Sequence, residues 1–308
     1  MNSSYNKDVA VTALEELYQG RMKEDEQLRT FLLDAKLSDY RVQLSNNPPC
    51  WRIVTGTGDD AYEAYFRVIG LLALSDLPPV RRANLNLRDK QVRNLRQKVT
   101  LTGLSSSSFR GNVEKLRDFG QFFRDYFAGK DIMLLAPALY EGHRSLVFHN
   151  RFFTDRALAP AEENLAFEDG IDPEGVLSQL QEQAFIHCSD NVVKYVALRK
   201  GQGTSKSPEF VKILPQQLQP GDIVEATVSF MVVKGKNDVH HMFGILRGLC
   251  LLDPTIRQAS VKARAPVRLA YLPIKVVEKA VRVKRKNIYE EEEVEKTMMW
   301  KLAVSDSD

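Results

Sequence analysis

The spacing of apolar residues predicts that the first 130 residues are largely helical. Asp8 can cap a helix that runs through Leu14 and Leu17, and Gly20 is a residue type that commonly ends helices. After Asn112, which can cap another helix, apolar residues recur every three to four positions, as they do on one face of a helix. These residues are Leu116, Phe119, Phe123, Tyr126 and Phe127.

Two more helices are predicted between these. Residues 61–72 are apolar nearly all round, which is typical of a buried central helix, and Pro78 and Pro79 would end it. A helix from about Leu87 to Val99 would carry its apolar residues on one face and basic residues on the rest.

Beyond Gly129 the pattern changes to that of strands. Short strands are predicted at 132–135, 145–148 and 192–196. The clearest signal is an alternation with a period of two between residues 224 and 232, which indicates a strand with one buried face. The loop 234–238 and a return strand from His241 to Leu252 complete a hairpin.

These elements predict an α+β protein. A helical N-terminal part, about 1–130, would pack with a β-rich part, about 131–275, built as an antiparallel sheet or a small barrel. Residues 276–308 would form a charged C-terminal tail. Small barrels of this kind often carry binding faces.

Composition favours a folded protein of a reducing compartment. Of the 308 residues 44% are hydrophobic, and the three cysteines form no CxxC pair. We expect Cys188 and Cys250, which lie in apolar runs, to be buried thiols. The N-terminus lacks the apolar core of a signal peptide, and the longest apolar run, Val68 to Leu74, is too short to cross a bilayer. We therefore expect a cytoplasmic or nuclear protein with no membrane partner.

Charge is distributed unevenly. Residues 79–103 contain seven basic side chains and one acid, and these basic side chains could neutralise several phosphates of a nucleic acid. They are Arg81, Arg82, Arg88, Lys90, Arg93, Arg96 and Lys98. No aromatic residue lies among them, so stacking on bases is not expected from this helix. The alternative is an exposed helix face that pairs with the acidic segment 157–193, which has eight acids and no Lys or Arg.

A metal site is a second hypothesis. His187, Asp190 and His240 could supply two imidazoles and a carboxylate to Fe(II), and His241 is an alternative ligand. This set, followed by Arg247, is similar to that of oxygenases that use Fe(II) and 2-oxoglutarate. Those enzymes use His-x-Asp, whereas two residues separate His187 from Asp190, which in a strand would put the side chains on opposite faces.

Signatures of other catalytic classes are missing from the sequence. Residues 201–206 contain Gly, Ser and Lys but not in P-loop order, and there is no GxSxG. No catalytic residue is assigned, and the leading interpretation is a non-enzymatic binding or scaffold protein. A protein-interaction subunit that uses the acidic segment 157–193 is a third possibility.

Three segments carry a resemblance to a known group. They are the IHxxDNxVxY stretch that begins at Ile186, the PGDIVE hairpin that begins at Pro220, and the LRxxxLLD strand that begins at Leu246. Within residues 185–253 the chain resembles a large group of uncharacterised intracellular proteins of mushroom-forming fungi. The resemblance implies no activity, cofactor or partner.

Overall fold

The computed structural model describes residues 1, 3–24, 30–58, 61–81, 89–181, 183–199 and 209–270, without the side chains of 89–90 and 264–270. Residues 1–264 form one compact unit and residues 265–308 a second. The predicted loop 201–208 and tail 276–308 lie outside the described residues.

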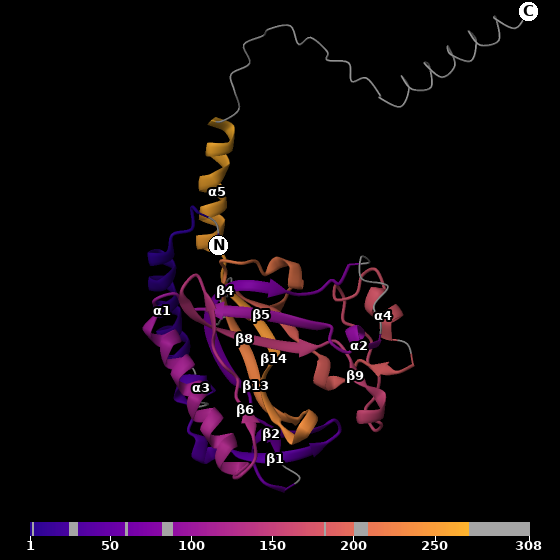
Figure 1. Cartoon of the computed structure of the whole chain (residues 1–308). Helices are drawn as coiled ribbons and strands as arrows, with labels where there is room; N and C mark the ends of the chain where they lie inside the picture. The colour runs from indigo at the N-terminus through magenta and orange to yellow at the C-terminus, as the bar shows by residue number, and fades with distance from the viewer. Residues whose placement is uncertain are drawn as a thin grey trace, which may run out of the picture. The chain divides into compact units, whose positions relative to one another are not determined.

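The described part of the chain contains both helices and strands, which makes this an α+β protein (Figure 1). The helices are α1 (Lys7–Glu24), α2 (Asp89–Val92), α3 (Ser107–Tyr126), α4 (Val176–Gln181) and α5 (Thr255–Ala270). The strands are β1 (Arg41–Asn46), β2 (Pro49–Thr55), β3 (Tyr62–Glu63), β4 (Phe66–Asp76), β5 (Arg96–Thr102), β6 (Ile132–Met133), β7 (Ala138–Tyr140), β8 (His143–Arg151), β9 (Thr154–Asp155), β10 (Phe185–Ile186), β11 (Lys194–Arg199), β12 (Glu209–Lys212), β13 (Ile223–Lys234) and β14 (His240–Asp253).

Five of the strands close into a barrel. β4, β5 and β8 are antiparallel neighbours, and β13 returns to pair with β4, which is a Greek key. β14 completes the barrel because it pairs with β13 in antiparallel and with β8 in parallel. A five-stranded Greek-key barrel is the architecture of the OB-fold. Strands from both sides of residue 130 thus belong to one barrel.

The segment predicted as a buried central helix is strand β4 instead. Its even positions, from Phe66 to Leu72, face the barrel core, while Ile69 and Leu71 on the other face pack against α1. A strand that is buried on both faces is apolar at nearly every position, so periodicity alone cannot distinguish it from a buried helix.

The predicted basic helix at 87–99 is also wrong. Among the described residues of this segment only α2 is helical, and from Arg96 onward the chain is strand β5, paired with β4 and β8. Burial alternates along the start of this strand: Gln97 and Val99 are buried, and Lys98 between them is exposed. The pairing with two neighbouring strands decides the conformation here.

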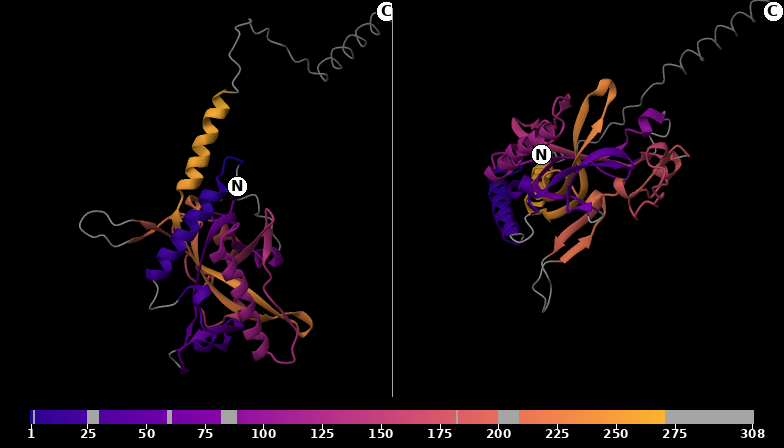
Figure 2. Two further views of the ribbon diagram at one scale, coloured as in Figure 1. Left: turned by 90° about the vertical axis from the view of Figure 1, so that its left-hand side faces the viewer. Right: turned by 90° about the horizontal axis from the view of Figure 1, so that it is seen from below.

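The hairpin prediction is confirmed. β13 and β14 pair from Ile223↔Asp253 to Lys234↔His240, and both views of Figure 2 show its orange tip projecting beyond the neighbouring strands. A short turn at Lys236–Asp238 joins them, in which Asn237 adopts a left-handed conformation with φ 55°. Asn is one of the few residue types that tolerate this region.

Two helices, α1 and α3, cover the barrel. The predicted helix through Leu14 is confirmed as α1, which buries Ala10, Leu14 and Tyr18. Its predicted bounds are wrong, because Asn6 rather than Asp8 accepts from a first-turn amide, that of Val9, and the helix continues past Gly20. α3 begins before Asn112, because the hydroxyl of Ser106 caps it by accepting a hydrogen bond from the amide of Phe109. Four residues of the predicted apolar stripe face the core, namely Leu116, Phe119, Phe123 and Phe127, whereas Tyr126 is exposed. In the core Phe119 packs against Phe66 and Phe230.

Two observations bear on the sequence predictions of compartment. The three cysteines are free and buried, as expected for Cys188 and Cys250. None of the helices in the described part of the chain combines the length and the apolar composition that crossing a lipid bilayer would need.

Candidate nucleic-acid interface

The outer face of strands β5 and β8 gathers basic side chains. In the antiparallel register Arg96 lies opposite Arg151 and Lys98 opposite His149. Side chains at these positions point to the same side of the sheet, because alternate residues of a strand share a face. The intervening Gln97 is buried and turned toward the barrel interior.

A pocket of about 180 Å³ opens beside these residues. Arg93, Arg96 and Arg151 line one side of it. The other side is apolar and comes from the β13–β14 hairpin, with Met231, Val233, Phe243 and Ile245. We call Arg93, Arg96, Lys98, His149, Arg151 and Phe243 the basic face.

The positive charge of the basic face is hardly neutralised. Within the described part of the chain, Arg96, Lys98 and Arg151 form no ion pair with a carboxylate. Only Arg93 does, through a 2.8 Å contact between its Nη2 and Oδ2 of Asp155, and both groups remain partly exposed. Such an exposed pair contributes little to stability and is easily exchanged.

Burial and mutual repulsion lower the pKa values of two groups of the basic face. Partial burial, together with the charges of Arg96 and Arg93, lowers the pKa of Arg151. Burial and then the charges of Arg96, Arg151 and Lys98 lower the pKa of His149 to about 4. His149 is therefore neutral near pH 7, and its Nδ1 has no hydrogen-bond partner in the described structure. A bound anion would relieve the repulsion.

Aromatic rings complete the basic face. The ring of Phe243 lies 5.8 Å from that of His149 and 6.3 Å from that of His241, measured between centroids. Phe243 is half-buried, so part of its ring is accessible. The sequence predicted no stacking residue among the basic side chains, and the tertiary structure supplies one from another strand.

The predicted nucleic-acid-binding residues separate into three groups. Arg93 and Arg96 line the pocket, and Lys98 lies beside it. Arg81 is exposed and does not line the pocket. Arg82, Arg88 and the side chain of Lys90 lie outside the described residues.

Sequence reasoning missed His149, Arg151 and Phe243. The predicted strand at 145–148 stopped too early to include the first two. Extending its alternation by three residues would have placed His149 and Arg151 on one face, although nothing local pairs them with Arg96.

The proposed iron ligands are not brought together. His187 is buried, and its Nδ1 lies 2.8 Å from the carbonyl oxygen of Phe152. Burial lowers the pKa of this imidazole. His240 is buried between the rings of Trp51 and Phe127. No group of three or more His, Cys, Asp or Glu side chains within the described ranges is placed to hold a metal ion.

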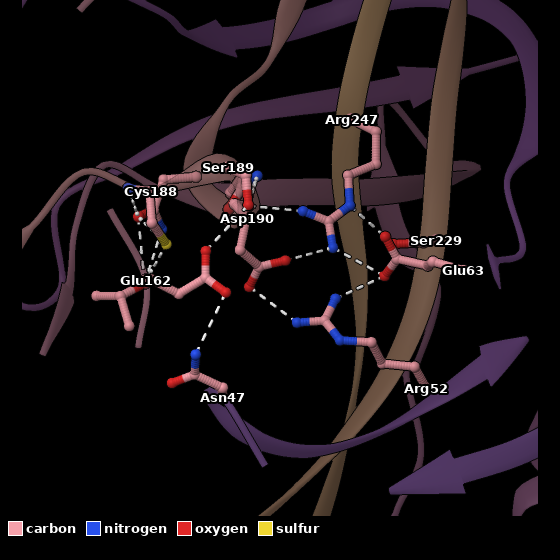
Figure 3. A network of polar contacts seen from close by, with 12 residues as sticks. Asn47, Arg52, Glu63, Glu162, Cys188, Ser189, Asp190, Ser229 and Arg247 are labelled. Atoms are coloured by element: carbon pink, nitrogen blue, oxygen red, sulfur yellow. Dashed lines mark hydrogen bonds and ion pairs between the residues drawn. The ribbon is translucent and has the colours of Figure 1, made fainter. Parts of the chain in front are cut away.

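Asp190 instead belongs to a closed network of four charged side chains (Figure 3). Its two carboxylate oxygens accept hydrogen bonds from Arg52 and Arg247 at 2.9 and 2.7 Å, and both arginines also contact Glu63. Arg247 donates further to the hydroxyl of Ser229 and the backbone oxygen of Asp190. The two positive and two negative charges balance each other. The network therefore links strands β2, β3 and β14 to the turn that carries Asp190.

The IHxxDNxVxY stretch has a structural role at the edge of the pocket. The side chain of Asn191 accepts a hydrogen bond from the amide of Cys188 and donates one to Thr154. Its backbone oxygen accepts one from Gln97, which in turn accepts from the hydroxyl of Tyr195. These contacts hold the turn that carries Asp190 and Asn191, both of which line the pocket.

The acidic segment 157–193 makes both local and long-range contacts, and Asp190 pairs with Arg52 and Arg247 as described above. Glu168 pairs with Lys194 and Lys212, and Asp172 accepts hydrogen bonds from the first amides of α4. Among the described residues, no ion pair joins this segment to the basic block 79–103. The sequence alternative in which the two blocks neutralise each other therefore has no support from these contacts.

No protein-family model matches the chain, and no curated protein matches it in sequence. Among solved structures the chain is similar to gp2.5, a single-stranded DNA binding protein encoded by bacteriophage T7. The two share 12% sequence identity, with a TM-score of 0.29, over 61% of this chain and 86% of that chain. A similarity of this size does not place the two proteins in one family.

Proposed function

We propose that this protein binds single-stranded nucleic acid on the basic face. The observation that carries the proposal is the gathering of three cations without ion pairs around a pocket whose opposite wall is apolar and aromatic. Such a surface fits a phosphate and a base of the same nucleotide. Positive grooves lined with aromatic side chains are the usual means by which proteins hold single strands.

The electrostatics favour a polyanion over a single anion. Arg96, Lys98 and Arg151 are spread over two strands, and their charges add to burial in lowering the pKa of His149. Several phosphates in a row would neutralise all of them, and each contact releases counterions.

The position of the basic face in the barrel agrees with this proposal. OB-folds bind oligonucleotides on the face of their second and third strands and on the loops between strands 1 and 2 and between strands 4 and 5. Here these strands are β5 and β8, and the two corresponding connections join β4 to β5 and β13 to β14. Fold alone does not establish function. The chemistry of the face is what points to nucleic acid.

Single strands are favoured over duplexes because a base must be unpaired to enter the pocket. In a duplex the bases are stacked and paired, whereas an unpaired base can enter a pocket and lie against a ring. We therefore expect tighter binding to an oligothymidylate than to a duplex of the same length.

The test is fluorescence anisotropy with a labelled oligothymidylate, comparing the protein with an R96Q/R151Q variant. We expect the variant to bind roughly tenfold more weakly, and the slope of log K against log salt to fall by about 1.4, because two phosphate contacts are lost. An R124Q/R199Q variant, which changes two exposed arginines that do not line the pocket, is the matched control. Unchanged affinity in R96Q/R151Q, or equal binding of duplex and single strand, would show the proposal to be wrong.

A further inference from the structure

A second, larger cleft lies between the first turns of α3 and the turn that joins β7 to β8. It has a volume of about 570 Å³. Arg110 and Arg117 of α3 line it together with His143 and Arg144 of β8. We call it the arginine cleft. All three of its arginines are exposed, and none of them forms an ion pair within the described part of the chain.

Two of the acids close to this cleft are engaged elsewhere. Glu15 accepts hydrogen bonds from Ser106, Ser107 and Ser108, and Glu141 pairs with Lys7. Glu114 lines the cleft and is its only acidic lining residue among the described ones. The side chains of the arginine cleft therefore carry an excess of positive charge.

The charge comes from guanidinium groups rather than from the end of α3. The first amides of this helix are already satisfied, because Ser106 accepts from Phe109 and Glu15 accepts from the amide of Ser108. An anion in the arginine cleft would thus be held by side chains from two separate elements. Arginine suits phosphate because its planar donors match two phosphate oxygens.

Strand β8 connects the arginine cleft with the basic face. His143 begins this strand and Arg151 ends it, and alternation assigns both to the side of His149, whereas it assigns Arg144 to the other side. At about 3.3 Å per residue the two ends are about 26 Å apart. This distance is compatible with the 4–16 nucleotides that one OB-fold covers. Between them the outward positions Thr100 and Val147 are uncharged, so the two positive sites are distinct.

We propose that the arginine cleft is a second binding site for the phosphate backbone of the same single strand; this proposal rests on the proposed function. A short oligonucleotide would occupy the basic face alone, whereas a longer one would also reach the arginine cleft. Affinity should therefore rise with length, and this gain should depend on Arg110 and Arg117.

The experiment compares oligothymidylates of about 5 and about 15 nucleotides, a range set by the site sizes of OB-folds. We expect R110Q/R117Q to bind the shorter one as the unmodified protein does and the longer one roughly tenfold more weakly, since two phosphate contacts are lost. R124Q is the matched control, because Arg124 lies seven residues beyond Arg117 on the same helix but does not line the arginine cleft. Unfolding temperatures must agree, which excludes an effect on folding.

The outcomes separate the two proposals. If R96Q/R151Q weakens both lengths and R110Q/R117Q weakens neither, the basic face binds nucleic acid and the proposal of a second binding site is wrong. Equal weakening of both lengths by R110Q/R117Q, or the same effect from R124Q, would also overturn it. Binding of a poly-glutamate peptide that R110Q/R117Q abolishes, with oligonucleotide binding intact, would assign the cleft to an acidic protein partner instead. If R96Q/R151Q changes nothing, the proposed function itself fails.

Discussion

Asp155 reduces the positive charge that the basic face offers to an anion, because its carboxylate pairs with Arg93 at the rim of the pocket. A phosphate would compete with this carboxylate for Arg93 and would be repelled by it. We expect Asp155→Asn to bind oligothymidylate about threefold more tightly, which corresponds to ~0.7 kcal/mol. The amide should still cap Ala157, whose backbone N–H donates to Asp155, because Asn is also a good cap.

Anisotropy titration measures the effect of Asp155→Asn, and Glu163→Gln, which changes an exposed acid outside the pocket, is the control. A weaker or unchanged affinity would contradict this role.

His149 should make binding depend on pH. Its pKa of about 4 in the free protein lies below the ordinary value of 6.5 because of burial and three neighbouring cations. A bound phosphate favours the charged imidazolium and raises this pKa, so the complex takes up a proton between about pH 6.5 and pH 4. We therefore expect affinity to increase as pH falls through this window. His149→Gln should flatten the profile, and an equally steep profile in this variant would refute the assignment.

The strands β2, β3 and β14 and the turn before β11 are held together by the network around Asp190. Burial raises the pKa of Asp190, but Arg247 and Arg52 lower it more, to about 2 against an ordinary 3.8. The unfolded chain therefore takes up the proton first as pH falls. The stability from this group is present above about pH 4 and is lost as pH falls toward 2.

Asp190→Asn should consequently reduce the free energy of unfolding by about 3 kcal/mol at pH 7, because it leaves two buried arginines with Glu63 as their one carboxylate partner in the network. Its stability should also change less between pH 4 and pH 2 than that of the unmodified protein. Urea unfolding at several pH values measures both. Asp238→Asn, which removes an exposed pair with Lys234, should leave the free energy of unfolding almost unchanged. Equal losses in the two variants would show that the network contributes little.

At the scale of the molecule, residues 1–264 should unfold as one unit. Phe66 precedes residue 130 and Phe230 follows it, yet their rings are 5.7 Å apart and both contact Phe119. We expect Phe66→Ala and Phe230→Ala each to cost about 3–5 kcal/mol in the same transition. Calorimetry with circular dichroism at two wavelengths tests this. Two separate transitions, with Phe66→Ala affecting only the first, would instead support the division at residue 130.

The sequence by itself determined the elements whose signal is local. The β13–β14 hairpin follows from alternation and a turn, and α3 follows from an apolar stripe at helical spacing. The existence of α1, although not its bounds, follows from end signals around Leu14 and Leu17. It also indicated the positive charge of 79–103, from which Arg93, Arg96 and Lys98 contribute to the basic face. These features depend on residues a few positions apart, so the chain shows them without any tertiary context.

Only the tertiary structure decided the rest. β4 is a strand because the barrel core covers one of its faces and α1 the other, and apolar character all round does not reveal which partners provide the burial. The basic face needs Arg96, Arg151 and Phe243 from three strands, and their proximity is set by β5–β8 and β8–β14 pairing over long separations. In the same way Asp190, a predicted metal ligand, is occupied by two arginines that are distant in sequence. Register between remote strands has no local signature, because it depends on the closure of the whole barrel.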